Sequence, residues 1–378
     1  MDSSKHWLPG VLNEAQMGLI IEQGFISGAR KDKVDGSALD LMLSETGFQM
    51  LQGSVKPRPK EKYGAYIQDF AKSISVGEDG CFHLKRRYTY IFKLRERLDP
   101  KLRALNIYGM ATAKSSVGRV DVLARLIVDG MGTYEQFNAD CLSEPRDMFV
   151  EVTPFTFDVS LKPNTALSQL RLFRGSPDDS ELRGKDWYDA VLEGPEAKEG
   201  CLSVNLEPTQ IAGKNAVAFV ARLPEELKTS GTDEIALWDR SEKPNPWQYW
   251  DIESSDDQGR FTITPERFYI LRSAEKIRLP PGVAVYCRAS DETIGEMRIH
   301  YAGFVHPRFG IREDGSGTPL IFEVRGHQVN VSLAQGERMA RLQFYRMSEN
   351  AEAESTYNKQ ELQLSKFFGD WRANQSEG

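Results

Sequence analysis

The sequence predicts a mainly β protein in which two related domains follow each other along the chain. Short runs of alternating or β-rich residues recur, and turns rich in Gly, Pro, Asn and Asp separate them. This spacing is typical of antiparallel sheets folded into barrels or sandwiches. A length of 378 residues also favours two or three domains over one. The predicted strands are Tyr88–Leu94, Phe149–Thr153, Phe157–Leu161, Ala216–Ala221, Phe268–Leu271 and Val329–Leu333.

An internal repeat supports the prediction of two domains. Phe149–Leu172 aligns with Ile321–Phe344 at a constant shift of 172 positions, and six of the 24 positions are identical. Average composition would give about one or two identities by chance. The alternative is that two hairpins look alike because both alternate with period 2. Because the turns also coincide, the alignment favours duplication.

The domain boundaries follow from the repeat and from composition. A first domain over residues 1–175 is followed by a linker over 176–200, which is acidic and carries Gly and Pro at intervals. We expect a helical turn in this linker around Trp187–Leu192. A second domain spans 201–348, and a tail spans 349–378.

The first element of the chain is predicted to be a short helix. Asn13 is a suitable N-cap, and Gln16 follows at the third helical position, as in a capping box. Leu12 and Met17 have the spacing of a hydrophobic staple. Gly24 is a natural end for the helix.

Composition and charge exclude several classes of protein. The net charge is 48 − 55 = −7, which argues against a general nucleic-acid binder or a protein of anionic membrane surfaces. The chain contains no run of about 18 apolar residues, so no transmembrane helix is expected. The opening MDSSKHWLPG lacks the apolar core of a signal peptide. The cysteines form no Cys-x-x-Cys pair, so the reducing cytoplasm is the expected compartment. They are Cys81, Cys141, Cys201 and Cys287.

A basic stretch in the first half is the first candidate site. Between Leu84 and Arg125 there are eleven Lys or Arg residues and three acids. Within this stretch lies Lys114–Arg119 (KSSVGR). These six residues offer two hydroxyls, backbone N–H groups and a guanidinium, all of which suit phosphate oxygens. The alternative is a polar turn in which Arg119 pairs with a surface acid. The matching stretch of the second half, 289–296, is acidic, so an anion site is expected once per chain.

Glu323 is the second candidate. It lies in the predicted strand Leu320–Val324, where period 2 places Ile321, Glu323 and Arg325 on one face. A carboxylate among apolar neighbours can have a raised pKa and accept a proton from water. The alternative is a solvent-facing Glu323 beside Arg325.

Other enzyme classes lack their sequence patterns. The five histidines show no metal-ligand spacing, and the His-x-Glu and Pro-Cys-x-x-Cys motifs of zinc deaminases are absent, so no zinc is expected. The chain has no Gly-x-Ser-x-Gly elbow, P-loop or dinucleotide-binding fingerprint.

Six motifs occur in the order found in one known family. Together they resemble the dCTP deaminase family of the dUTPase-like superfamily, and in particular its bacterial long form, which joins two such domains in one chain. The resemblance implies two dUTPase-like (β-clip) distorted β-barrel domains in tandem, with a few short helices. The motifs are Gly10–Ile26, Ser37–Leu41, Lys114–Arg119, Ser168–Leu170, Ala302–Gly310 followed by Glu323, and Tyr357–Gln360 followed by Ser365.

The resemblance implies hydrolytic deamination of dCTP to dUTP and ammonia, with Glu323 activating water. It also implies a Mg²⁺ ion bound through the nucleotide phosphates and a trimeric arrangement of domains in a homo-oligomer. In family trimers the phosphate motif of one subunit faces the base-binding hairpin of its neighbour. Whether one chain or two would form such a site here is open. The implied substrate-binding residues are Lys114, Ser115, Ser116, Arg119, Gln169, Ala302, Val305, Tyr357 and Gln360.

Departures from the family pattern leave other functions open. Lys114 stands where the family usually has Arg. His306 stands where it usually has Asp, and Arg308 where it has Gly. In relatives that also cleave the triphosphate, that Asp activates water, so His306 argues against pyrophosphatase activity. The alternatives are a dUTP pyrophosphatase, a bifunctional enzyme, or a non-catalytic nucleotide-binding protein. Glu151, the repeat partner of Glu323, is interpreted as structural or vestigial.

Overall fold

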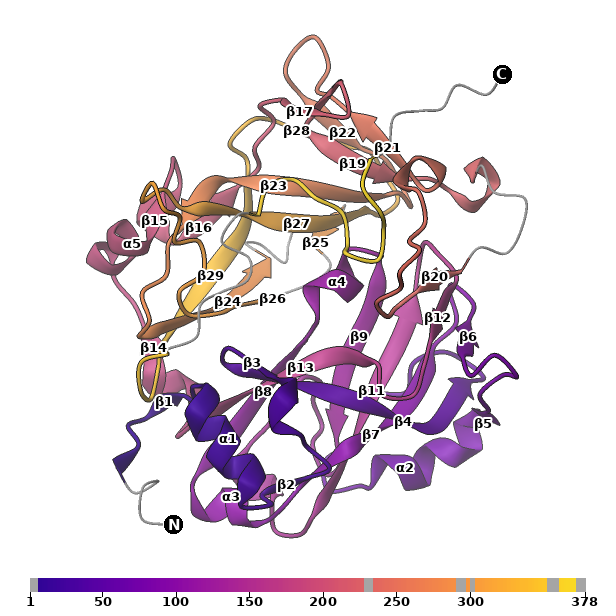
Figure 1. The fold of residues 1–378 in the computed structure, drawn as a ribbon, viewed down its shortest axis with the longest axis vertical. Helices are drawn as coiled ribbons and strands as arrows, with labels where there is room; N and C mark the ends of the chain where they lie inside the picture. Colours follow the sequence, from indigo (N-terminus) through magenta and orange to yellow (C-terminus); the bar gives the residue numbers. More distant parts are fainter. Residues whose placement is uncertain (1–5, 228–233, 290–296, 300–302, 352–359, 372–378) are drawn as a thin grey trace.

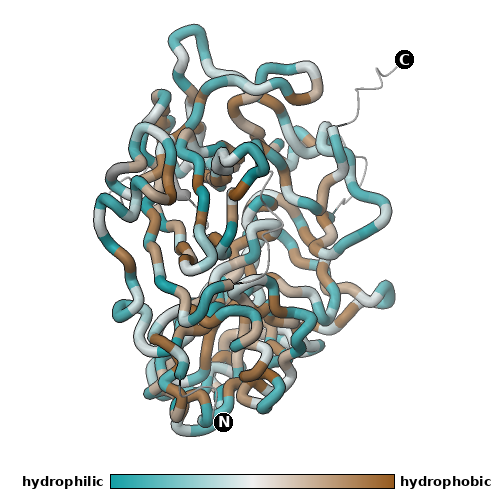
Figure 2. Tube along the Cα trace, turned by 60° about the vertical axis from the view of Figure 1, so that its left-hand side comes forward, coloured by the Kyte–Doolittle hydropathy of each residue, from teal (hydrophilic) through white to brown (hydrophobic). Residues whose placement is uncertain are grey.

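The computed structural model describes residues 6–227, 234–289, 297–299, 303–351 and 360–371. The chain is mainly β, as predicted. In Figure 1 the first half of the chain lies below and the second half above, and a C-terminal segment runs between them. Hydrophobic residues gather along the strands of both halves, while hydrophilic ones dominate the outer loops (Figure 2).

Helices are few and short. The predicted N-terminal helix is α1 (Glu14–Glu22), and its capping box is present: the Asn13 side chain accepts from the Gln16 N–H, and Gln16 accepts from the Asn13 N–H. Gly24 follows with a φ of 70°, a left-handed conformation that suits glycine at a helix end. The other α-helices of the described residues are α2 (Tyr63–Tyr66), α3 (Lys101–Ala104), α4 (Ser115–Gly118) and α5 (Lys185–Val191).

The first half forms one large antiparallel sheet that nearly closes into a barrel. Its main path runs β10-β8-β13-β4-β7-β11-β9, and β8 and β10 at one end contact β9 at the other. Leu, Val and Phe side chains fill the interior. The strands are β1 (Gly10–Val11), β2 (Ile26–Ser27), β3 (Val34–Asp35), β4 (Ala38–Met50), β5 (Ala71–Ile74), β7 (Tyr90–Leu98), β8 (Ile107–Ala113), β9 (Val122–Val128), β10 (Gln136–Phe137), β11 (Arg146–Pro154) and β13 (Ala166–Arg174).

The second half builds its core between two antiparallel sheets. One runs β14-β29-β24-β26 with β16 beside β29, and the other runs β21-β19-β23-β27-β25 with β15 beside β23. Their strands are β14 (Glu181–Leu182), β15 (Leu192–Glu193), β16 (Cys201–Ser203), β19 (Ala218–Ala221), β21 (Trp250–Glu253), β23 (Phe268–Ile277), β24 (Val283–Ala289), β25 (Met297–Ile299), β26 (Gly303–Val305), β27 (Thr318–Gly326) and β29 (Arg338–Arg346). Two small ribbons add β17 (Thr209–Ile211) with β18 (Lys214–Ala216), and β22 (Phe261–Ile263) with β28 (Val331–Leu333).

The repeat is matched residue for residue by the strands. At the shift of 172 positions, the bounds of β11 coincide with those of β27, those of β12 (Val159–Leu161) with those of β28, and those of β13 with those of β29. This agreement supports duplication over chance similarity of two hairpins. The predicted strand Phe157–Leu161 shortens to β12, because Phe157 instead packs its ring against aromatic side chains of the second half.

Two segments connect the halves. Residues of the expected linker lie on the second half's sheets, where β14 pairs with β29 and β15 with β23. In addition, β20 (Ile235–Ala236) of the second half pairs in parallel with β12 of the first, and β6 (Phe82–Leu84) pairs with β12 on its other side. The backbone thus bridges the halves beyond the covalent connection. None of the described helices has the length and apolar character that a membrane span needs.

The end of the described chain fastens the halves with aromatic side chains. Phe368 lies against Phe157 of the first half and against Tyr249 and Trp250 of the second. Trp371 packs on Phe219 and Trp247. Because Phe368 is 4% exposed, it acts as a buried plug between the halves, and Leu362 and Phe367 of the same segment are buried as well.

Phe368→Ala is expected to lower the free energy of unfolding by about 3 kcal/mol, since it removes a buried ring and leaves a cavity. Chemical denaturation monitored by tryptophan fluorescence measures this. Phe70→Ala is the matched control: Phe70 is 39% exposed, and its replacement should change stability by less than about 0.5 kcal/mol. Equal effects of the two variants would contradict the role of Phe368.

Candidate active site

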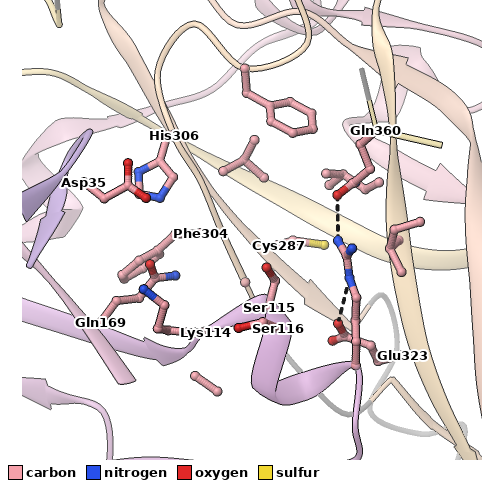
Figure 3. A pocket seen from close by; sticks show the side chains of 17 residues that line it. Asp35, Lys114, Ser115, Ser116, Gln169, Cys287, Phe304, His306, Glu323 and Gln360 are labelled. Atoms are coloured by element: carbon pink, nitrogen blue, oxygen red, sulfur yellow. Dashed lines mark hydrogen bonds and ion pairs between the residues drawn. The ribbon is translucent and has the colours of Figure 1, made fainter. Parts of the chain in front are cut away.

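A cavity that opens to solvent lies where the two halves meet. Its walls come from the β8–α4 turn and β13 of the first half, from β24, β26 and β27 of the second half, and from the C-terminal segment (Figure 3). Most sequence-predicted site residues line it. The lining residues are Asp35, Ala113, Lys114, Ser115, Ser116, Arg119, Gln169, Cys287, Gly303, Phe304, Val305, His306, Phe309, Leu320, Ile321, Glu323 and Gln360.

The phosphate-like turn forms one wall. Buried Val117 and Gly118 hold α4 against the first half, so that Ser115 and Ser116 face the cavity (Figure 3). The first N–H groups of such a short helix have no intrahelical acceptor. Lys114 forms an ion pair with Asp40, and the Gln169 amide donates to Thr112 Oγ1 at 3.2 Å. The turn therefore gathers donors and positive charge on one side.

Arg119 and Glu323 meet inside the cavity of a single chain. Arg119 follows α4 and is 6% exposed, and Glu323 lies on β27 and is 5% exposed. Arg119 Nε is 3.8 Å from Glu323 Oε1, and Arg119 Nη2 donates to Gln360 Oε1 at 2.6 Å (Figure 3). The alternative of a surface ion pair for Arg119 is wrong, because its acidic neighbour is the buried Glu323.

The environment of Glu323 raises the proton affinity of its carboxylate. Burial raises its pKa to about 8; Arg119 counteracts this rise, and Asp121 adds to it. The guanidinium only partly compensates for burial because 3.8 Å is long for an ion pair. Among the described residues, no hydrogen-bond donor reaches the carboxylate. The solvent-facing alternative for Glu323 is therefore wrong.

His306 lies at the opposite end of the cavity, beside Asp35 (Figure 3). Its Nδ1 is 3.3 Å from Ser37 Oγ. Burial, with smaller contributions from Arg171 and Lys114, lowers the pKa of His306 to about 3, so the ring is neutral at physiological pH. Asp35 is exposed at the mouth of the cavity, and the partial loss of water around its carboxylate raises its pKa. Gly36 fits here because a Cβ at this position would lie 3.1 Å from the imidazole.

The hairpin strand β26 forms a further wall and is fixed by an arginine of the first half. Arg171 Nη1 donates to the Val285 carbonyl at 3.0 Å, and Nη2 donates to the Val305 carbonyl at 3.3 Å. The guanidinium also stacks on Phe304, 4.0 Å from the ring centroid. Because Arg171 is fully buried, the position of β26 depends on the opposite half.

The C-terminal segment reaches the cavity through Gln360. Besides binding Arg119, its amide donates to the Pro319 carbonyl at 3.2 Å, and Ser365 Oγ donates to the Ser116 carbonyl at 2.6 Å. Two predicted substrate-binding residues, Ala302 and Tyr357, lie outside the described residues.

The basic stretch does not act as one patch. Several of its side chains pair with acids on the surface: Lys85 with Asp158, Arg87 with Glu266, and both Lys93 and Arg97 with Asp147. Of this stretch, Lys114 and Arg119 line the cavity. The local positive balance in the sequence therefore overstates the charge available to a ligand.

Glu151, the repeat partner of Glu323, lies in a different environment. It accepts hydrogen bonds from Ser54 at 2.5 Å, from Tyr134 at 3.2 Å and from Arg125 Nε at 3.1 Å. Arg125 also stacks on Tyr134 at 3.9 Å. With its oxygens engaged, Glu151 is suited to a structural role.

Sequence reasoning missed several cavity residues. Ile321 could have been found, since it shares the face of Glu323 at period 2. Asp35 stands two residues before the Ser37 motif. Phe304 and Phe309 lie within the Ala302–Gly310 motif but were not singled out, whereas Cys287 reaches the cavity through the long-range pairing of β24 with β26, for which the sequence carries no local signal.

Protein-held metal ions have no evident site in the described part of the chain, where no three His, Cys, Asp or Glu side chains cluster suitably. This does not test the prediction that Mg²⁺ binds through the nucleotide phosphates.

Comparisons with known proteins place the chain in one family. Residues 8–176 match the model of the 2'-deoxycytidine 5'-triphosphate deaminase N-terminal domain, and residues 189–368 match the model of the C-terminal domain. The crystal structure of the 2'-deoxycytidine 5'-triphosphate deaminase from Agrobacterium tumefaciens is similar, with a TM-score of 0.79 and 23% identity over 91% of this chain and 97% of that chain. This likeness shows the fold.

Other comparisons add nothing to the argument. Two β-glucuronidase structures from Bacteroides uniformis have TM-scores of 0.19 and 0.18 at 11% identity; they cover 81% and 80% of this chain and 28% and 27% of theirs. No curated protein sequence matches the chain.

Proposed function

Because the chain belongs to the 2'-deoxycytidine 5'-triphosphate deaminase family, we propose that it converts dCTP and water to dUTP and ammonia in the cavity between its halves. The observation that carries this proposal is the meeting of Arg119 and Glu323 in that cavity. The turn that carries Arg119 is suited to binding an anion, and β27 offers the buried carboxylate of Glu323. A single nucleotide could contact both.

The polarity of the cavity supports one orientation of the substrate. The triphosphate would lie against Lys114, Ser115 and Ser116, with Arg119 and Gln169 as further donors, because phosphate oxygens favour charge-assisted hydrogen bonds. The cytosine would lie toward β26 and β27, near Val305 and Glu323. Gln360 would cover the nucleotide from the C-terminal segment. Ala302 and Tyr357 stay predicted substrate-binding residues.

The chemistry requires one group that both accepts and returns protons. Glu323 takes a proton from water, and the resulting hydroxide attacks C4 of cytosine. The same carboxyl then returns that proton to the leaving amino group, and the proton of the hydroxyl added at C4 ends on N3, so that ammonia departs and dUTP with its C4 carbonyl remains. A pKa of about 8 suits this exchange near neutral pH. A Mg²⁺ ion bound to the triphosphate would neutralise part of its charge.

Finer features of the assembly belong to the same proposal. We infer that each half is a dUTPase-like β-clip barrel, with the domains at 1–175 and 201–348, a connection over 176–200 and a closing tail over 349–378. We also infer a homo-oligomer in which domains are arranged as trimers, and a cytoplasmic enzyme. The exact agreement of the β11–β13 and β27–β29 bounds supports the first of these inferences.

Pyrophosphate release is not expected. The position at which a water-activating Asp would stand holds His306, and its half-buried, neutral ring near Arg171 is a weak base. A carboxylate there would have been the stronger sign of a dUTP pyrophosphatase.

Incubation with dCTP and Mg²⁺ is therefore expected to release ammonia and dUTP in equal amounts, with no dUMP. Ammonia is measured by a coupled assay and the nucleotides by chromatography. Formation of dUMP and pyrophosphate would instead support a bifunctional enzyme. A rise in melting temperature with dCTP but without product would identify a nucleotide-binding protein and refute the proposal.

A further inference from the structure

A second ion pair lies beside Arg119 and Glu323. On β27, Glu323 and Arg325 are two residues apart, so their side chains leave the same face of the strand. On the first half, Arg119 and Asp121 are also two residues apart. Arg119 faces Glu323, and Asp121 pairs with Arg325. The charges of one half therefore meet opposite charges of the other in register.

Asp121 is a buried residue of the first half that forms an ion pair with Arg325 of the second half. It is 0% exposed, and its Oδ2 accepts from Thr156 Oγ1 at 2.5 Å as well as from Arg325 Nη1. Arg325 Nη1 also approaches Thr156 Oγ1 at 3.1 Å, and the guanidinium lies 5.4 Å from the Phe155 ring centroid. The Phe155 N–H donates to the Asp121 carbonyl at 2.9 Å.

The backbone at Asp121 is held in an uncommon conformation. Its φ is 56°, in the left-handed region that residues other than glycine rarely adopt. The Asp121 N–H bonds to the Gly118 carbonyl at 2.8 Å, which ties the residue to the end of α4. The same turn thus places both Arg119 and Asp121.

We propose that Asp121 is a positioning residue that draws Arg325 onto the first half and away from Glu323, so that Arg119 is the guanidinium that faces the catalytic carboxylate. The inference rests on the proposed function of Glu323. It assigns a role to two residues outside the cavity lining, which touch neither substrate nor water in the proposed reaction.

Electrostatics give the pair an effect with a definite sign. The described charged or titratable groups around Glu323 are Arg119, Asp121, Arg325 on its own strand, and Cys287 on β24. Cys287 stays neutral because burial raises its pKa to about 12. Arg119 lowers the pKa of Glu323 and Asp121 raises it. The Gln360 amide and the Ile270 side chain, which faces Glu323 in register from β23, carry no charge.

Removing one member of the pair therefore changes proton binding by Glu323 in a predictable direction. Asp121→Asn deletes a nearby negative charge and releases the Arg325 cation, and both changes lower the pKa of Glu323. Arg325→Gln leaves Asp121 without its counterion, which raises that pKa. In the double variant the two changes largely cancel.

The test follows the acid limb of the pH profile of kcat/KM for dCTP. Because the proposed base is active when deprotonated, a lower pKa moves the limb to lower pH. We expect a downward shift of roughly 0.5–1 pH unit for Asp121→Asn and an upward shift of similar size for Arg325→Gln. The double variant and Arg325→Lys, which keeps the charge, should lie near the unmodified protein.

If Asp121 had a purely structural role, its replacement would change kcat and stability but not the position of the acid limb. Thr156→Val is the control, since it removes a hydroxyl of the cluster without changing charge and should leave the limb in place. Lower kcat and stability in both single variants with an unshifted limb would overturn the proposal. If Asp121→Asn fails to fold, the upward shift of the acid limb expected for Arg325→Gln still tests the proposal.

A second readout separates this inference from the proposed function. The carboxyl ¹³C signal of Glu323, assigned by its loss in Glu323→Gln, can be titrated by NMR without substrate. An unmodified protein that releases no ammonia would refute the proposed function, whereas the opposite shifts of the two variants in the NMR titration would still support the role of Asp121. Absent NMR shifts in an active enzyme would refute that role alone.

Discussion

Glu323→Gln is expected to reduce ammonia release from dCTP by about 10²–10⁴-fold, the usual contribution of a positioned acid–base group. The amide is nearly the same size as the carboxylate but cannot take a proton from water. Binding should survive, because the phosphate contacts lie on the other half of the chain. A steady-state ammonia assay measures the loss, and the melting temperature with dCTP measures the binding.

Glu151→Gln is the matched control for this variant. It makes the same chemical change at the repeat-related buried carboxylate, which binds Arg125, Ser54 and Tyr134. We expect it to lower stability and to leave kcat near that of the unmodified enzyme. Ammonia release by Glu323→Gln at the full rate would refute the assignment of the base.

Arg119→Gln is expected to have the second-largest effect, for two separable reasons. It removes a donor proposed to bind phosphate oxygens, a loss of about 1.5–3 kcal/mol for a charged hydrogen bond, or roughly 10–10²-fold in kcat/KM. It also removes the cation that lowers the pKa of Glu323. That pKa would rise above about 8, and the acid limb of the profile would move to higher pH.

Arg125→Gln provides the corresponding control, because Arg125 pairs with Glu151 as Arg119 faces Glu323. It should destabilise the first half and leave the acid limb unchanged. The measurement is kcat/KM against pH for both variants. If Arg119→Gln kept the limb of the unmodified enzyme, Arg119 would not be the cation that governs Glu323.

Local signals in the sequence were sufficient for much of the fold. Asn13 and Gln16 predict the start of α1 because a capping box depends on residues three positions apart. The repeat predicts the strand–turn–strand unit of both halves, since alternation within a strand is also local. The ends of predicted strands were less accurate where tertiary contacts decide, as at Phe157, whose ring packs on Tyr249 and Trp250.

The composition of the cavity could be predicted only in part. Arg119 and Glu323 were identified from motifs, yet their 204-residue separation hides their contact. Alternation placed Arg325 beside Glu323 on one face of the strand, but it gave no partner for either side chain; in the structure Arg325 pairs with Asp121 of the other half. Arg171 gave no signal, because its acceptors are backbone carbonyls of the opposite half. Such partners depend on how the halves dock.

The parallel pairing of β20 with β12, together with the Phe368 plug, has a consequence for how the cavity assembles. Arg119 and Glu323 belong to one chain and are present in a one-to-one ratio, so their encounter is intramolecular and has an effective concentration far above that of any free protein in solution. Neither half therefore has to supply both members of the Arg119–Glu323 pair by itself. The same buried position of the repeat can therefore differ in chemistry: Glu151 is engaged by Arg125, Ser54 and Tyr134, whereas no donor of the described residues lies within hydrogen-bond distance of Glu323.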